Sequence, residues 1–123
     1  LYQLKNKYPG RIKNVLGRGY MLGVSFEFPK MGADKFSFAI PNSFFKTYDS
    51  VMIAALIREF YTKHKILLHF TATDPHILHI TPPLISGKEQ IDAFLKAFEE
   101  VLEGGLYKVI LSFITSNFKQ VLN

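Results

Sequence analysis

The four histidines are the residues of this chain best suited to chemistry, because an imidazole exchanges protons near neutral pH and binds metal ions. They are His64, His69, His76 and His79. The first three do not have the spacing that places ligands on one helix. His69 and His79 lie in two apolar segments that we expect to be neighbouring strands, where the rings could face each other. Two histidines without a third ligand make a poor site, so we predict no metal centre.

Lysine and cysteine are less suited than histidine to chemistry in this chain. A lysine becomes a nucleophile only where its surroundings lower its pKa, and Lys65, Lys88 and Lys96 lie on or beside predicted helices, where a solvated charge is expected. Cysteine is absent, which excludes disulfides and thiolate metal sites and fits a reducing compartment, so we expect the cytoplasm. We predict that this chain holds no catalytic residue and binds no cofactor by itself.

The elements that must position these side chains alternate between strands and helices. The patterns predict a short strand over residues 12–16, a longer one after Gly19, and two more over residues 66–70 and 77–81, with a further short strand near residues 35–40. Residues 1–7 fit the end of a helix whose beginning is missing. Helical spacing appears over residues 45–63, after Ser86 and over residues 106–122. Together these strands and helices predict an α+β domain, in which helices pack on one face of a small, mostly antiparallel sheet.

Several local signals set the boundaries of these elements. Gly17 and Gly19 suit a tight link with positive φ, and Gly23 inside a strand indicates a bulge or a close approach by another backbone. The sequence from Ser86 to Glu89 predicts a capping box, in which the serine oxygen accepts a hydrogen bond from the Glu89 amide. Gly104 and Gly105 predict the end of that helix.

The composition restricts the classes of partner. Of 123 residues, 48% are apolar and twelve are phenylalanine, so we expect one folded unit with a phenylalanine-rich core. The formal charge is +5, but the fifteen Lys and Arg residues are dispersed rather than grouped in a block, so we expect no nucleic-acid partner. No apolar run approaches the ~20 residues that cross a bilayer, so we expect no membrane partner.

Two motifs together resemble a known family. The segment Gly17-Arg18-Gly19-Tyr20-Met21-Leu22-Gly23 is similar to the Gly-x-Gly-Leu-Met-x-Gly that opens the C-terminal small domain of class III pyridoxal-phosphate-dependent aminotransferases, with tyrosine for leucine. The segment from Ile77 to Ser86, ILHITPPLIS, resembles the strand, Pro-Pro-Leu and final helix of the same domain. A helix and a short strand lie between them in matching order. The resemblance covers most of residues 1–103, and residues 104–123 would be a C-terminal helical extension.

The resemblance implies a function for a longer protein of the ornithine, 4-aminobutyrate and polyamine type. Such an enzyme transfers an amino group between an amine or amino acid and a 2-oxo acid with pyridoxal phosphate. It is usually a homodimer with a large cofactor-binding domain upstream, and that domain supplies the Schiff-base lysine. This chain would shape the substrate entrance and cover the cofactor domain.

The sequence departs from the family pattern at two positions. The helix before the middle strand commonly ends in glycine, whereas here Lys65 precedes Ile66, so its cap must adopt another or a strained conformation. His79 stands where the family usually has an arginine that binds the substrate carboxylate. A neutral histidine has one donor and cannot bind a carboxylate bidentately. If His79 faces the substrate, it suits an amine without an α-carboxylate, or an enzyme whose carboxylate site lies elsewhere.

Other interpretations remain open on the sequence. His79 could be a partly buried, hydrogen-bonded histidine with no role in binding. The chain could also be a small basic α+β module that binds RNA or a protein partner, with Tyr20 and the phenylalanines exposed for stacking. Membrane attachment through residues 106–122 is the least supported, because only Lys108 and Lys119 would attract anionic lipid.

Overall fold

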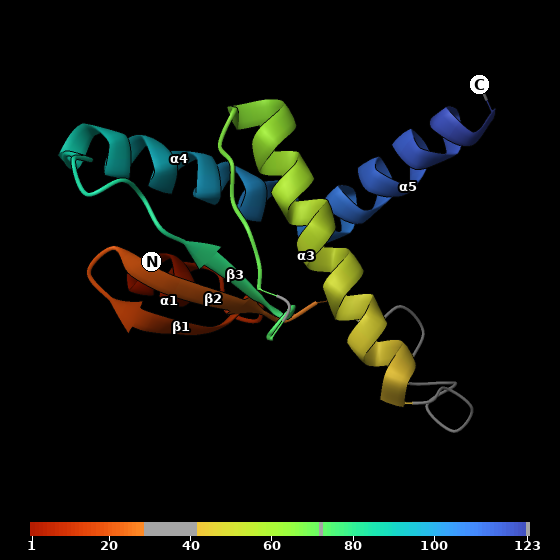
Figure 1. Cartoon of the computed structure of the whole chain (residues 1–123), viewed down its shortest axis with the longest axis horizontal. Coiled ribbons are helices and arrows are strands. Elements are labelled where there is room, and N and C mark those ends of the chain that lie inside the picture. Colours follow the sequence, from red (N-terminus) through yellow and green to blue (C-terminus); the bar gives the residue numbers. More distant parts are fainter. Residues whose placement is uncertain (29–41, 72, 123) are drawn as a thin grey trace.

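The computed structural model describes residues 1–28, 42–71 and 73–122. In these ranges it contains α1 (Tyr2–Lys7), β1 (Ile12–Arg18), β2 (Met21–Phe26), α3 (Asn42–His64), β3 (Ile77–Ile80), α4 (Lys88–Gly104) and α5 (Leu106–Leu122). The three strands form one antiparallel sheet in the order β1-β2-β3. Figure 1 shows α3 and α4 on one side of this sheet, with α5 extending away from it. The predicted α+β class is therefore confirmed, and the possible strand near residues 35–40 lies outside the described residues.

The β1–β2 hairpin follows from its glycines. Gly17 and Gly19 both have positive φ, at 95° and 58°, which closes the tight link that the sequence predicts. A register shift between Ile12 and Asn14 marks an irregularity early in β1. Along β2, Val24 and Phe26 are buried while Met21 is exposed, as is Glu27 just after the strand, so the alternating pattern defines an inner and an outer face.

The core lies between the inner face of the sheet and the helices. Met52, Leu56 and Phe60 recur every four residues along α3 and are almost fully buried, as the helical spacing predicts. Phe98 of α4 stacks against Phe26 of β2 and packs tilted against Phe60 of α3, with ring centroids 6.0 and 5.5 Å apart. These aromatic contacts join the sheet to both helices, and removing the Phe98 ring would open a cavity at the junction of three elements.

Two local predictions are wrong. Residues 66–70 do not form a regular strand: only His69 bridges β3, opposite His79. The segment leaves α3 and meets β3 at this one position, while the other edge of β3 pairs with β2. The cap of α4 is also displaced by one residue, because Gly87 is the N-cap and its amide donates to Gln90 Oε1 at 2.9 Å.

The backbone groups of Ser86 explain the displaced cap. Its amide donates to the carbonyl oxygen of Pro83 at 2.9 Å, and its carbonyl accepts from the Tyr20 hydroxyl at 2.9 Å. Ser86 thus belongs to the turn that follows Pro83 and to the contact with the β1–β2 link. The helix therefore begins at Lys88, one residue after Gly87.

Candidate functional site

His79 lies on the outer face of the sheet. Its neighbours Leu78 and Ile80 are buried in the core, and successive strand side chains point to opposite faces, so His79 points away from α3 and α4. It is half-buried, and its cross-strand partner on β2 is Gly23. In the part of the chain that the structure describes, no helix covers this outer face (Figure 1).

Gly23 allows the strands beside His79 to pack closely. A Cβ atom at this position would lie 2.8 Å from Cγ2 of Ile77, which is closer than real side chains approach. The contact that the glycine permits is thus with a side chain of β3, rather than with the backbone or bulge that the sequence suggests.

His69 completes a pair of imidazoles on this face. The His79 amide donates to the His69 carbonyl at 2.8 Å, and the two rings stack with centroids 5.6 Å apart and 25° between their planes. The expected facing of the two histidines is therefore confirmed. Within the described ranges, no cluster of three His, Asp or Glu side chains could hold a metal ion. The arrangement offers hydrogen-bonding groups and a flat ring surface.

Several large apolar side chains are exposed on the segments that carry or adjoin the histidine pair. Met21 on β2 is 76% exposed, and Leu67, two residues before His69, is 79% exposed. At the exit of β3, Leu84 and Ile85 are 84% and 95% exposed on a turn that Tyr20 ties to the β1–β2 link. Large apolar side chains exposed to this extent are typical of a face that another protein surface covers.

A cavity of about 400 Å³ opens at the β1 side of the same face. Leu16, Ser25 and Ile77 line it from the three strands, and polar groups of His76, Asp49 and Asp74 line it from outside the sheet. His76 Nδ1 lies 3.7 Å from Asp49 Oδ2, and the His76 amide donates to Asp74 Oδ1 at 3.3 Å. Sequence reasoning missed this group, since Asp49 is on α3 and no local pattern connects it with His76.

Three lysines bear on the prediction that this chain has no Schiff-base site. Lys65, Lys88 and Lys96 are exposed on helix surfaces or just beyond a helix end. A lysine that condenses with a carbonyl group needs a desolvated pocket or a neighbouring cation that favours its neutral form. None of these three side chains has either surrounding, so none of them is a candidate Schiff-base lysine.

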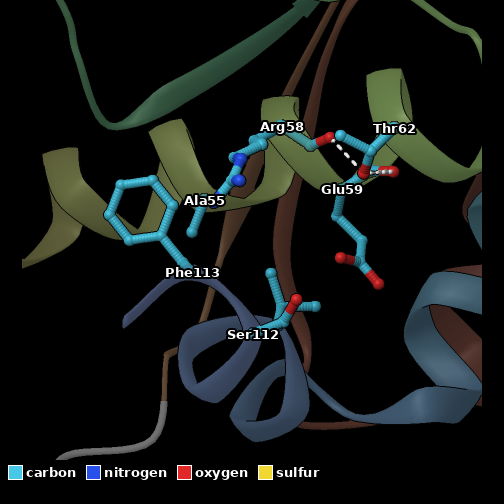
Figure 2. A pocket seen from close by; sticks show the side chains of 7 residues that line it. Ala55, Arg58, Glu59, Thr62, Ser112 and Phe113 are labelled. Carbon is cyan, nitrogen blue, oxygen red and sulfur yellow. Dashed lines mark hydrogen bonds between the residues drawn. The ribbon is translucent and has the colours of Figure 1, made fainter. Parts of the chain in front are cut away.

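A second cavity, of about 200 Å³, lies where α3 meets α5. Figure 2 shows Arg58, Glu59 and Thr62 of α3 facing Ser112 and Phe113 of α5. The Arg58 guanidinium lies 5.9 Å from the Phe113 ring centroid and donates to the Ser116 hydroxyl. Glu59 is only 8% exposed and pairs with Lys63 one turn along α3. Since Glu59 is paired with Lys63 and Arg58 is engaged by Phe113 and Ser116, we interpret the cavity as a joint between two helices.

A third polar cluster joins α1 to α4. The Lys7 ammonium pairs with the Glu99 carboxylate, and the Tyr8 hydroxyl donates to Glu103 at 2.9 Å and to Glu99 at 3.2 Å. The hydrogen bond from Lys7 lowers the pKa of Glu99, and the same bond raises the pKa of Lys7. Burial, followed by the hydrogen bonds to Glu103 and Glu99, raises the pKa of Tyr8. The cluster holds the N-terminal helix and has no cavity beside it among those described.

Two results bear on the class of protein. No helix in the described ranges is both long and apolar enough to cross a membrane. No known protein-family model matches the chain.

Proposed function

We propose that this chain is the C-terminal small domain of a class III pyridoxal-phosphate-dependent aminotransferase. The whole protein would transfer an amino group between an amine or amino acid and a 2-oxo acid, in the cytoplasm and as a homodimer. A large upstream domain would hold the cofactor and supply the Schiff-base lysine. The observation that carries the proposal is the position of His79: the residue that matches the family's substrate-binding arginine lies on the outer sheet face, which no described helix covers.

The apolar surface around His79 supports the same proposal. Met21 and Leu67 are exposed on the outer face, and Leu84 follows the double proline on the adjoining turn. Side chains of this size remain in water only at a cost of about 25 cal/mol for each Å² of apolar surface. A large domain resting on this face would bury them and would place His79 at the boundary between the two domains.

The motif positions agree with the proposed domain. The glycine-rich segment forms the β1–β2 link, and Pro82 and Pro83 form the rigid exit of β3 toward α4. Lys65, which stands where the family commonly has glycine, has φ of 57°. The helix end thus keeps the left-handed conformation that favours glycine, although the residue differs.

The histidine restricts the proposed substrates. Only one N–H donor is available on a neutral imidazole, and the ring is held against His69. Strong bidentate binding of an α-carboxylate is therefore not expected at this position. Either the amino donor has no α-carboxylate, as in a polyamine, or another part of the protein binds the α-carboxylate of the donor.

The decisive experiment uses the whole gene product that contains this chain. We expect borohydride reduction of the purified protein to attach the cofactor to one lysine upstream of the chain, which peptide mass spectrometry would locate. We also expect amine-dependent bleaching of the cofactor absorbance, followed by its return when a 2-oxo acid is added. A gene product without a lysine-bearing upstream domain would contradict the proposal.

The alternative of a basic binding module has less support. It requires aromatic rings exposed on the sheet, but Phe26 and Phe28 are buried and stack on each other, with centroids 5.8 Å apart. The Tyr20 hydroxyl is bonded to the Ser86 carbonyl. Salt-dependent binding of single-stranded RNA by the chain would favour this alternative, because phosphate contacts weaken as salt rises.

A further inference from the structure

Helix α5 carries two adjoining apolar faces, one buried and one exposed. Its inner face, which includes Leu106, Val109 and Ile110, is buried in the core against α3 and α4. Arg58 fixes this orientation by stacking over Phe113 and bonding to Ser116. Because both contacts use the inner side of α5, they leave the second apolar face in solvent.

The second face has the spacing of a coiled-coil seam. Its residues follow one another at intervals of four, three, four and three, and all are exposed to between 45% and 85%. This regular alternation keeps side chains on one line along a helix that packs against another helix. We call this line the α5 seam; it comprises Tyr107, Leu111, Ile114, Phe118 and Val121.

We propose that the α5 seam binds the α5 seam of a second copy of this chain, with the two helices antiparallel and centred on Ile114. In that arrangement Ile114 meets its counterpart, Tyr107 lies opposite Val121, and Leu111 packs against Phe118 with an offset of one residue. Each outer layer combines a larger side chain with a smaller one, which is how facing helices fill the space between them. The sequence of the seam is thus complementary to its own reverse.

The charges of α5 are compatible with this pairing. Lys108 and Lys119 are its only charged residues, and neither belongs to the seam. Lys119 lies on the polar side of the helix with Ser112 and Thr115, well away from the seam. No charge would be desolvated at the centre of the interface, so association does not carry the cost of burying an unpaired ion.

The shape of the molecule favours the antiparallel direction. In Figure 1 the sheet, α3 and α4 gather around the first part of α5, while the C-terminal end extends away from them. An antiparallel pair places the two folded bodies at opposite ends of the seam, whereas a parallel pair would bring them together at one end. The exposed fractions along the seam correspond to roughly 1,000 Å² buried over both copies, at the lower limit for a specific interface, so the dimer should be weak and reversible.

The first test measures the oligomeric state of the 123-residue chain. Sedimentation velocity from about 1 to about 100 μM should show a concentration-dependent monomer–dimer equilibrium. Ile114→Glu should weaken dimerisation by at least about 10-fold, because two carboxylates would face each other in an apolar contact. Lys119→Glu is the matched control: it alters the net charge more, lies outside the seam and should leave the equilibrium unchanged.

The second test determines the direction of the pair. The chain has no cysteine, so single introduced thiols report only on the new contact. An oxidised mixture of Leu111→Cys and Phe118→Cys chains should form the mixed disulfide in preference to either homodimer. Far-UV circular dichroism would confirm that each variant is folded. A monomer at every concentration, a dimer that Ile114→Glu does not weaken, or a preference for the two homodimers would overturn the proposal. None of these results depends on His79, so they leave the proposed enzyme function untouched.

Discussion

The imidazole rings of His69 and His79 stack on the outer face of the sheet, with their centroids 5.6 Å apart. The hydrogen bond from the His79 amide to the His69 carbonyl holds the two backbones together. The rings are therefore positioned by this backbone hydrogen bond as well as by their own contact. One side of the His79 ring is covered by His69. A molecule that binds here must approach from the other side or along the ring edge.

The tight β1–β2 link predicts unequal effects at its two glycines. A Cβ atom at Gly17 would lie 2.0 Å from the Met21 carbonyl oxygen, whereas nothing lies within 4 Å of one at Gly19. Both have positive φ, so alanine is strained at either position. We expect Gly19→Ala to lower the free energy of unfolding by about 1 kcal/mol and Gly17→Ala by more than about 2 kcal/mol. Urea unfolding followed by circular dichroism, which needs no tryptophan, would measure both; equal losses would contradict the backbone clash.

The end of α3 predicts a stabilising substitution. Lys65 is the only non-glycine residue with positive φ in the described ranges, and its amide donates to the Tyr61 carbonyl at 3.1 Å. Glycine adopts this conformation without a Cβ penalty, so Lys65→Gly should raise the free energy of unfolding by about 0.5–1 kcal/mol, net of its extra chain entropy. Lys63→Gly, two residues earlier inside the helix, should lower it by about 1 kcal/mol. Urea unfolding should therefore give changes of opposite sign.

Elements with a strong local pattern could be predicted from the sequence. The spacing of Met52, Leu56 and Phe60 determines the buried side of α3, and Gly105, with φ of 84°, ends α4 where the glycine pair predicts. These features depend on residues within a few turns of one another. The same holds for the glycine link between β1 and β2.

Features that depend on distant residues could not be predicted. Residues 66–70 alternate as a strand does, but whether they pair along their length depends on how the chain returns from α3 to β3. The predicted cap at Ser86 is wrong because Tyr20, 66 residues away, and Pro83 use the backbone groups of Ser86. At the site, strand alternation places His79 opposite Leu78, but the sequence does not say which face the helices cover. Its role in binding stays a prediction.

The contact of α1 with α4 predicts how stability changes with pH. The lowered pKa of Glu99 means that its ionised form stabilises the fold; this contribution is present above the ordinary carboxyl pKa and is lost as the pH falls through the lowered value. The raised pKa values of Lys7 and Tyr8 act in the opposite direction: their contributions are present below about pH 10 and are lost as the pH rises through the raised values. We expect a plateau of stability at neutral pH with a decline on both sides.

Urea unfolding across pH would test this expectation against the variant Glu99→Gln. Removing the carboxylate removes the partner of Lys7 and one acceptor of Tyr8, so both declines should become shallower. Because the pair is solvent-exposed, added salt should reduce the difference between the two proteins. A control at Glu89, in the first turn of α4, changes the same charge without touching α1.

The role of His79 can be tested by restoring the residue that the family usually has. In the proposed whole enzyme, His79→Arg would place a guanidinium on the outer sheet face, where it can bind a carboxylate bidentately. We expect KM for donors that carry an α-carboxylate to fall roughly 10-fold, because one charge-assisted contact contributes about 1.5–3 kcal/mol, partly offset by desolvation. KM for amines without an α-carboxylate should stay constant. Met21→Arg adds the same charge to the same face, so it separates local contact from general attraction. If both variants change KM equally, or neither changes it, His79 does not contact the substrate carboxylate and serves instead to hold the strand against His69.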